Sequence, residues 1–239
     1  MSKNIAIIFA GGVGTGVGSA IPKQFIEVNH KAVIIYTLEI FENHPDIDAI
    51  YVSCKEEYIE KLQEMSERYH IHKIRKIVPG GATGMDSIYN ALCAASKENE
   101  EDAVVLIHDG VRPCITKELI DRNLAAVRHF GSAITAVPLY ETPVISEDGQ
   151  TVDQIPTRSK CYIAQAPQCF TLGEVIKAHE KMRTENPGYK GIVDTCSMMR
   201  MLGKELHLVA GSRKNIKITT PEDLHMFHVM IQCKGLEDE

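Results

Sequence analysis

A glycine-rich stretch with one isolated lysine is the first part of the chain that could do chemistry. Residues 10–25 read AGGVGTGVGSAIPKQF and directly follow an apolar run that ends at Phe9. Glycines in this position let backbone N–H groups converge on an anion, because no Cβ obstructs the approach, and Lys23 would add a point charge on a phosphate. The spacing fits neither the dinucleotide-binding G-x-G-x-x-G pattern nor a phosphate loop that ends in Gly-Lys-Ser/Thr. From this stretch alone, an anion cradle and a flexible surface loop both remain open.

A carboxylate and a guanidinium follow another apolar run. The stretch LIHDGVRP (106–113) places Asp109 and Arg112 where a strand should end. A single carboxylate there suits Mg²⁺, which binds one or two acids together with substrate phosphates. The alternative is that Asp109 caps the following turn. His108, its neighbour, is interpreted as a structural residue.

Two further stretches add a second glycine turn and a second lysine. The turn lies in VPGGATGMDS (78–87), and Lys217 lies on a short strand candidate in RKNIKITTPED (213–223). Taken singly, each has an ordinary interpretation, as a plain loop and as a solvated lysine.

The elements that must position these residues alternate along the chain. Apolar, β-branched runs predict strands over 4–10, 48–54, 72–80, 102–110 and 132–139. Apolar residues at helical spacing predict helices over 32–43, 55–69, 84–97 and 116–129. This alternation predicts an α/β fold, with a Rossmann-like, mostly parallel sheet flanked by helices. Right-handed crossovers place the loops after the strands along one edge, where open α/β sheets bind ligands. The four features all fall at that edge.

The alternation stops between residues 139 and 170. The Asp148-Gly149 pair, with β-type sequence on both sides, indicates a hairpin, and the segment is interpreted as an inserted β-arm that packs on a second subunit. Helices resume at Thr171, which forms a capping-box pattern with Glu174, again near 193–203, and finally after Thr220. The chain is interpreted as one domain over 1–232, followed by a tail over 233–239.

Composition excludes several classes of protein. The net charge is −6 and no basic block is present, which disfavours nucleic acid as a partner. No run approaches the roughly 20 apolar residues of a membrane span, and the N-terminus lacks a signal-peptide pattern, so we expect a cytoplasmic protein. The seven cysteines have no CxxC spacing and are expected to be reduced.

Together these stretches resemble the cytidylyltransferases that activate polyol phosphates, a family that includes the 2-C-methyl-D-erythritol 4-phosphate and the ribitol 5-phosphate enzymes. The resemblance rests on AGGVGTGVGSAIPKQF, GGATGMDSIYNAL, HDGVRP, IPTRSKCYIAQAPQCF, VDTCSMM and NIKITTPEDL, in family order over about residues 4–232. It implies that CTP and a polyol phosphate give a CDP-polyol and pyrophosphate. It also implies Mg²⁺ or another divalent cation, and a homodimer joined through the arm.

The resemblance carries roles over to individual residues. Those that would bind the nucleotide are Ala10, Gly11, Gly12, Gly14, Gly81 and Ser87. Those that would act on the reacting phosphates are Lys23, Asp109, Arg112 and Lys217, with the metal on Asp109. Those that would bind the polyol phosphate of the other subunit, from the arm, are Thr142 and Arg158.

The chain departs from the family pattern at Gly16 and Gly84, where arginines are usual, and at Ala82, where many members have an acid. Either the remaining cations suffice, or the protein is a nucleotide-binding homologue with weak or no catalysis. A sugar nucleotidyltransferase that uses another nucleoside triphosphate is a further alternative. A NAD-binding oxidoreductase is disfavoured by the glycine spacing. The motifs leave the identity of the polyol open.

Overall fold

The fold is built on one strand that is buried on both faces. The computed structural model describes residues 2–11 and 21–237. β1 (Asn4–Ala10) pairs in parallel with β4 (Ala49–Cys54) on one side and β6 (Val104–Asp109) on the other. Successive side chains of a strand point to opposite faces, and in β1 both sets are apolar except for Asn4 at its start, as expected for a parallel sheet covered by helices on both sides.

The described residues form a seven-stranded sheet in the order β5-β4-β1-β6-β8-β7-β9. The remaining strands of this sheet are β5 (Ile74–Pro79), β7 (Ser132–Pro138), β8 (Tyr162–Thr171) and β9 (Leu208–Ala210). Only β8 runs antiparallel to its neighbours. A separate small hairpin pairs β2 (Glu27–Val28) with β3 (Lys31–Ala32). The predicted α/β class with a mostly parallel sheet is confirmed.

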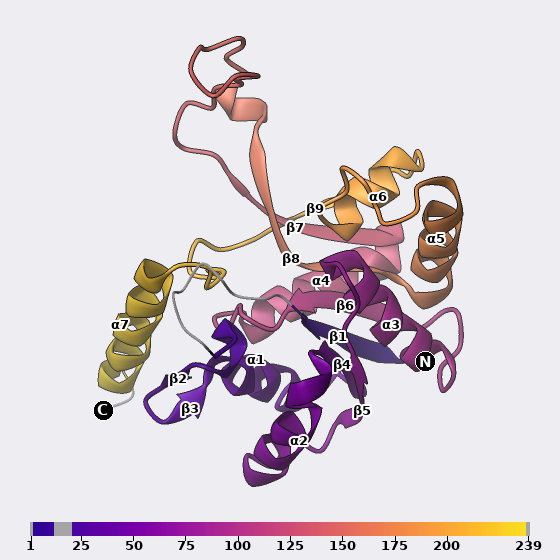
Figure 1. The fold of residues 1–239 in the computed structure, drawn as a ribbon, viewed down its shortest axis with the longest axis vertical. Coiled ribbons are helices and arrows are strands. Elements are labelled where there is room, and N and C mark those ends of the chain that lie inside the picture. The colour runs from indigo at the N-terminus through magenta and orange to yellow at the C-terminus, as the bar shows by residue number, and fades with distance from the viewer. Residues whose placement is uncertain (1, 12–20, 238–239) are drawn as a thin grey trace.

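Helices cover both faces of this sheet (Figure 1). One buried cluster packs the sheet against α1 (Val33–Glu42), α2 (Ile59–Arg68) and α4 (Lys117–Phe130). The other packs it against α3 (Gly84–Ser96), α5 (Leu172–Glu185) and α6 (Thr195–Met201). α7 (Pro221–Glu237) packs beside α1, where Phe227 meets Tyr36 edge to face. This last helix continues past residue 232, where the sequence placed the start of a tail.

The boundary of the arm differs from the sequence-based expectation. The segment between β7 and β8 projects away from the body (Figure 1), and the hairpin signal is correct, because Ile145 bridges Gln154 and Gly149 takes a φ of 71° between them. The C-terminal part of the predicted arm, however, is β8, whose residues 165–170 are buried in the central sheet. Neither the core strand nor the projecting segment has helical periodicity, so the sequence pattern predicted a single arm over both.

The starts of the helices agree with the sequence patterns, with one exception. Thr83, Thr116 and Asp194 each accept a backbone N–H as helix caps, and Thr220 accepts the N–H of Asp223 at 3.3 Å. The capping box predicted at Thr171 is wrong, because its side chain makes no capping hydrogen bond. Instead, the first N–H groups of α5 donate to the backbone carbonyls of residues 101 and 103, which satisfies them without a side chain.

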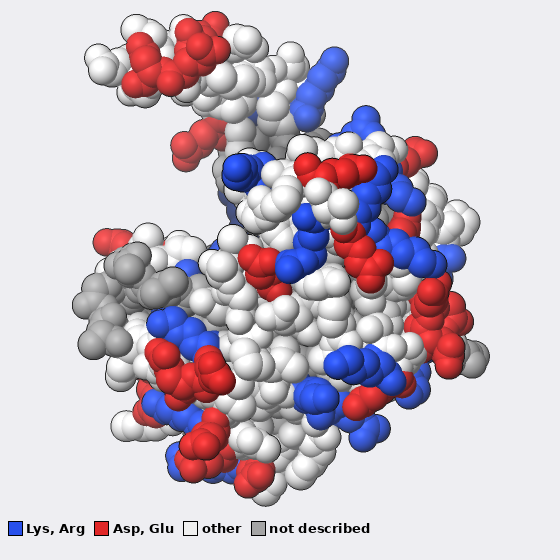
Figure 2. All heavy atoms as spheres, turned by 45° about the vertical axis from the view of Figure 1, so that its right-hand side comes forward, with Lys and Arg blue, Asp and Glu red and all other residues white. Residues whose placement is uncertain are grey.

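Two properties of the exterior bear on possible partners. None of the helices in the described part of the chain is long and apolar enough to cross a bilayer. On the face drawn in Figure 2, basic and acidic side chains are interspersed and form no continuous basic stripe, unlike a surface that neutralises a nucleic-acid backbone.

Two buried histidines should make stability depend on pH. Burial lowers the pKa of His108 to about 4 and that of His179 to about 3, whereas an unfolded histidine has a pKa near 6.5. Below that value the unfolded state binds more protons than the folded state, so acid favours unfolding. We expect the free energy of unfolding to fall by about 2 kcal/mol per histidine between pH 7 and pH 5, as measured by urea denaturation.

The control for this effect is His179→Gln. The variant should be less stable at pH 7, because the buried histidine ring hydrogen-bonds with the Tyr189 hydroxyl at 2.8 Å, but its stability should depend less on pH. A pH dependence as steep as that of the unaltered protein would contradict the assignment.

Candidate active site

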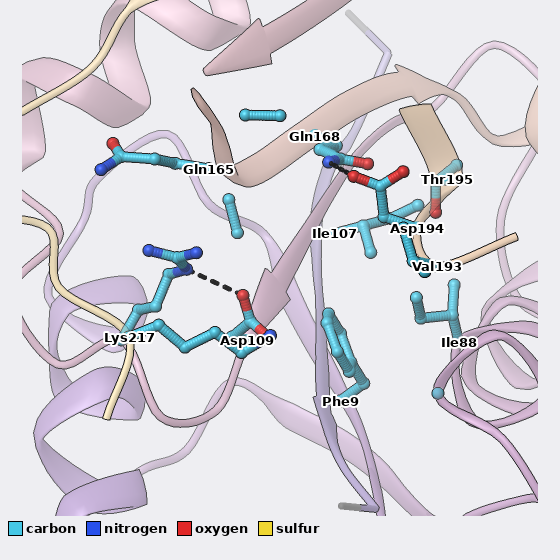
Figure 3. A pocket seen from close by; sticks show the side chains of 14 residues that line it. Phe9, Ile88, Ile107, Asp109, Gln165, Gln168, Val193, Asp194, Thr195 and Lys217 are labelled. Carbon is cyan, nitrogen blue, oxygen red and sulfur yellow. Dashed lines mark hydrogen bonds and ion pairs between the residues drawn. The ribbon is translucent and has the colours of Figure 1, made fainter. Parts of the chain in front are cut away.

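A buried carboxylate lies at the carboxyl end of the central strand β6. Asp109 is 5% exposed. Its Oδ2 accepts the Arg112 Nε–H at 2.8 Å, and its Oδ1 lies 2.7 Å from Lys217 Nζ (Figure 3). Burial alone would raise the pKa of this carboxyl, but the charges of Lys217 and Arg112 outweigh burial and hold the pKa below its usual value. Asp109 is therefore an anion clamped between two cations.

The same contacts fix the segment that carries Lys217. Arg112 Nη1 donates to the carbonyl of Asn215 at 2.8 Å. Asn215 is fully buried and donates from Nδ2 to the carbonyl of Ala166 in β8 at 2.7 Å. A lysine more than 100 residues from Asp109 in the sequence is thus held at the end of β6 by backbone anchors.

Lys23 comes to this site from the other end of the chain. It begins a 3₁₀ turn, Lys23–Phe25, and is half buried. Burial lowers its pKa, Lys217 lowers it further, and Asp109 and Asp223 oppose the shift. Lys23 therefore lies within electrostatic reach of both Lys217 and Asp109, and the four residues predicted to act on phosphates are brought together.

The two glycine-rich segments meet beside this cluster. Ser87 accepts the N–H of Gly81 at 3.0 Å, and a Cβ placed on Gly11 would lie 2.6 Å from Ser87 Oγ. Gly11 is thus required where the first loop passes the second turn. Ala10 is buried at the end of β1, and its carbonyl accepts the side-chain amide of Gln24. Gly12 and Gly14, predicted to bind the triphosphate, lie outside the described residues, as does Gly16.

Gly84 has a different environment. It is the first residue of α3, it lines the cavity beside Asp109, and a Cβ added to it would meet no atom within 4 Å. The structure therefore has space for a larger side chain at this position, where the family usually carries an arginine.

A cavity of about 230 Å³ opens over Asp109, Arg112 and Lys217. Sequence reasoning missed several polar residues that line it: Gln165, Gln168, Asp194 and Thr195. The first two lie on β8, which was assigned to the arm. The other two lie at the start of α6, whose cap, Asp194, is recognisable in the sequence once the helix is placed.

The two arm residues lie elsewhere. Thr142 and Arg158 are exposed and do not line the cavity of their own chain. Arg158 donates to the carbonyl of Tyr140 at 2.9 Å, which holds it against the arm. Their predicted role requires a second subunit.

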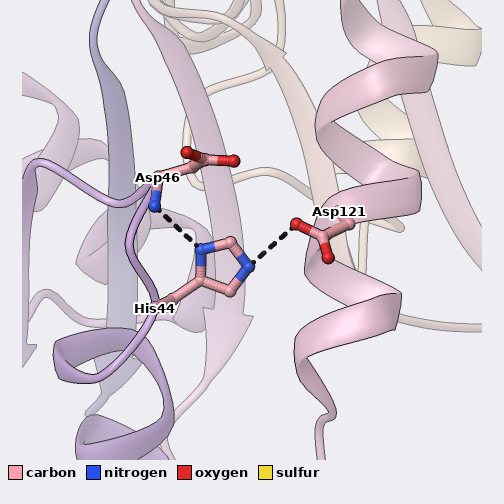
Figure 4. Close-up of side chains that lie close together, drawn as sticks. All are labelled: His44, Asp46 and Asp121. Carbon is pink, nitrogen blue, oxygen red and sulfur yellow. Dashed lines mark hydrogen bonds and ion pairs between the residues drawn. The ribbon is translucent and has the colours of Figure 1, made fainter.

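Among the described residues, one group of side chains is close enough to hold a metal by itself, and it does not include Asp109. His44, Asp46 and Asp121 place their ligand atoms within 4.8 Å of one another (Figure 4). His44 Nδ1 accepts the N–H of Asp46 at 3.2 Å, so the ring proton is on Nε2, which lies 3.1 Å from Asp121. This arrangement links the segment after α1 to α4. His108 is fully buried, packs against Phe41, and places its Nε2 3.2 Å from the Arg112 carbonyl, contacts that support its structural interpretation.

Comparisons with known proteins identify relatives of this chain in sequence and in fold. A sequence model described as IspD, 2-C-methyl-D-erythritol 4-phosphate cytidylyltransferase, matches residues 4–232. A Vibrio parahaemolyticus protein named ribitol-5-phosphate cytidylyltransferase is 45% identical over 232 residues, 97% of each chain. A Clostridium botulinum protein named 2-C-methyl-D-erythritol 4-phosphate cytidylyltransferase is 40% identical over 224 residues, 94% of this chain and 95% of that one. The solved 4-diphosphocytidyl-2C-methyl-D-erythritol synthase of Anaerococcus prevotii matches with a TM-score of 0.83 at 29% identity, covering 97% of this chain and 96% of that one.

Removing the charge of Asp109 should destabilise the fold. In Asp109→Asn the mostly buried Arg112 loses its anionic partner, and we expect the free energy of unfolding to fall by about 1–3 kcal/mol, with little contribution from the more exposed Lys217. The matched control is Asp102→Asn, an exposed acid just before the same strand, which should change stability by less than about 0.5 kcal/mol. Equal urea midpoints for the two variants would show that the clamp does not stabilise the fold.

Proposed function

This chain belongs to the 2-C-methyl-D-erythritol 4-phosphate cytidylyltransferase family and transfers a cytidylyl group from CTP to a polyol phosphate, and we propose that its preferred acceptor is ribitol 5-phosphate. The observation that carries this preference is the higher identity to the Vibrio parahaemolyticus protein, which carries the ribitol name. The second candidate acceptor is 2-C-methyl-D-erythritol 4-phosphate, because the family description and the Clostridium botulinum relative carry that name.

The reaction brings polyanions together, so neutralisation of charge is the main requirement. The acceptor's phosphate oxygen is already anionic near pH 7 and attacks the α-phosphorus of CTP in line. A new P–O bond forms there, the bond from the α-phosphorus to the bridging oxygen breaks, and pyrophosphate leaves with the electron pair. No protein nucleophile or base is required, so positioning and electrostatics supply the catalysis.

The described cations suit this requirement. Lys23 and the backbone after Ala10 would bind the triphosphate, while Gly81 and Ser87 would border the cytidine. Lys217 and Arg112 would hold the acceptor's phosphate close to the α-phosphorus. Support comes from the ion pairs of Asp109, because they bring both cations to one end of the cavity before either substrate arrives.

Asp109 would also hold Mg²⁺ or another divalent cation. A single buried carboxylate fits a metal that takes one or two acids and completes its shell with substrate phosphates and water. When bound, the metal would supply further neutralisation of the phosphate oxygens. Lys217 and Arg112, which occupy the carboxylate in this structure, would then turn toward the substrate phosphates.

The arm would join two chains into a homodimer. Its exposed apolar side chains include Val144, Ile145, Val152 and Ile155, which is typical of a surface that is covered by a partner. Thr142 and Arg158 would then reach the acceptor site of the other subunit. We place the protein in the cytoplasm, where CTP is available.

The proposed reaction can be tested by pyrophosphate release. We expect CTP, Mg²⁺ and ribitol 5-phosphate to give pyrophosphate and CDP-ribitol. The kcat/KM for ribitol 5-phosphate should be higher than the kcat/KM for 2-C-methyl-D-erythritol 4-phosphate. UTP, GTP and ATP should support little turnover. CTP binding without turnover on either acceptor would favour the nucleotide-binding homologue, and a higher kcat/KM for the erythritol acceptor would reverse the assignment.

The control variant for this assay is Asp109→Asn. We expect its kcat/KM to fall by about 10²–10³, the usual effect of removing one preorganised electrostatic group, while Asp102→Asn should leave the rate unchanged. Undiminished turnover in Asp109→Asn would remove the proposed metal role.

Action across a dimer predicts complementation between two inactive variants. Asp109→Asn damages the site of its own subunit, whereas Arg158→Ala should damage the site of its partner. After the two variants are mixed and their subunits exchange, half of the dimers are mixed, and each has one intact site. We therefore expect about a quarter of the unaltered activity to return. No recovery, with subunit exchange verified by mass spectrometry, would mean that Arg158 acts within its own chain or not at all.

A further inference from the structure

A buried polar atom without a partner that also borders a cavity is a candidate contact for a ligand. Nearly all buried polar atoms in folded proteins make a hydrogen bond. Seven buried side-chain nitrogen or oxygen atoms in the described part of the chain have no hydrogen bond, although one of them, His44 Nε2, faces the Asp121 carboxylate at 3.1 Å. Two of them, Gln165 Oε1 and Thr195 Oγ1, belong to residues that line the cavity over Asp109.

Thr195 lies on the wall opposite the charged cluster. It is the first residue of α6 and is 1% exposed. Its neighbours are already engaged, because Asp194 accepts the Ser197 N–H at 2.8 Å and the Gln168 side-chain amide at 2.8 Å. Figure 3 shows Thr195 beside Asp194, across the cavity from Asp109 and Lys217. The Thr195 hydroxyl is therefore left for a bound molecule.

Gln165 provides a second such group on β8. Its Nε2 donates to the carbonyl of Ser212 at 3.0 Å, which fixes the amide and leaves Oε1 as an acceptor without a donor. The side chain is more than nine-tenths buried, since the residue is 8% exposed. The two unpartnered oxygens therefore come from different elements that border one cavity.

We infer that Thr195 and Gln165 recognise hydroxyl groups of the acceptor and determine which polyol phosphates are used; this inference rests on the proposed function. With the acceptor's phosphate near Lys217 and Arg112, its carbon chain extends across the cavity toward α6. Gln165 Oε1 accepts a hydroxyl proton, and Thr195 Oγ1 donates or accepts. Phe9, Ile88 and Ile107 line the same cavity and limit access of water.

A site of this kind distinguishes between acceptors, because its buried oxygens need hydroxyl partners on the bound molecule. An acceptor without the matching hydroxyls leaves the buried oxygens unsatisfied, and such sites reject the deficient molecule strongly. A longer polyol phosphate should therefore bind better than a short one because of these two residues.

The test is equilibrium binding by isothermal titration calorimetry, with ribitol 5-phosphate and the shorter glycerol 3-phosphate as probes. Thr195→Val keeps the shape of the side chain and removes the hydroxyl, so we expect its Kd for ribitol 5-phosphate to rise about 10-fold, the loss of one hydrogen bond. The Kd for glycerol 3-phosphate and that for CTP should stay within about 2-fold. Thr195→Ser retains the hydroxyl and should restore most of the affinity for ribitol 5-phosphate.

Gln165→Met is a second variant that tests the same cavity if Thr195→Val does not fold. It should also lower the affinity for ribitol 5-phosphate while leaving the affinity for glycerol 3-phosphate unchanged. Ser66→Ala removes a buried hydroxyl that bonds only within α2 and should change neither affinity. Unchanged affinity for ribitol 5-phosphate in both site variants, or an equal loss for both probes, would overturn the inference. If the unaltered protein binds ribitol 5-phosphate but does not turn it over, the proposed function fails and the binding comparison still decides the role of Thr195.

Discussion

The ion pairs of Asp109 are the constraint on which the site depends. One carboxylate at the end of β6 holds Arg112 from the following turn and Lys217 from a distant segment. A buried charge is costly unless it is paired, and Arg112, the more buried of the two cations, supplies most of this pairing. The same contacts therefore hold the sheet edge and the cationic site together.

The antiparallel strand β8 gives the cavity its second wall. It inserts between β6 and β7 and lines the cavity with Gln165, on the side of Lys217, and with Gln168, on the side of Asp194 (Figure 3). Ala166, in the same strand, anchors Asn215 and through it the segment of Lys217. One strand therefore supports both the charged end and the polar end of the cavity, which suits an acceptor with a phosphate at one end and hydroxyls along the rest.

Sequence patterns predicted the charged half of the site but not the polar half. Asp109 and Arg112 follow a strand-like run, and the rule that parallel strands bind ligands at their carboxyl ends placed them correctly. The strand predicted at Lys217 is wrong, because the structure describes every residue between β9 and α7 and has no strand there; Lys217 reaches the site on a segment held by backbone hydrogen bonds. Gln165 and Thr195 carry no comparable signal, because glutamine and threonine are common in arms and helix starts. Their importance follows from burial without a partner, which is a property of the folded molecule.

The sequence by itself determined the α/β class, the order of the central-sheet strands and their helices through β7, and the residues that meet at one edge, because apolar periodicity fixes which segments are buried. It did not predict the small β2–β3 hairpin. Only the tertiary structure decided that β8 belongs to the core, since its neighbours β6 and β7 are separated from it by the arm. The start of α5 also depends on tertiary structure. Carbonyls of residues 101 and 103 accept its first N–H groups, in place of the cap that the sequence predicted at Thr171. Long-range hydrogen bonds of this kind depend on which segments become neighbours, and local sequence does not encode that.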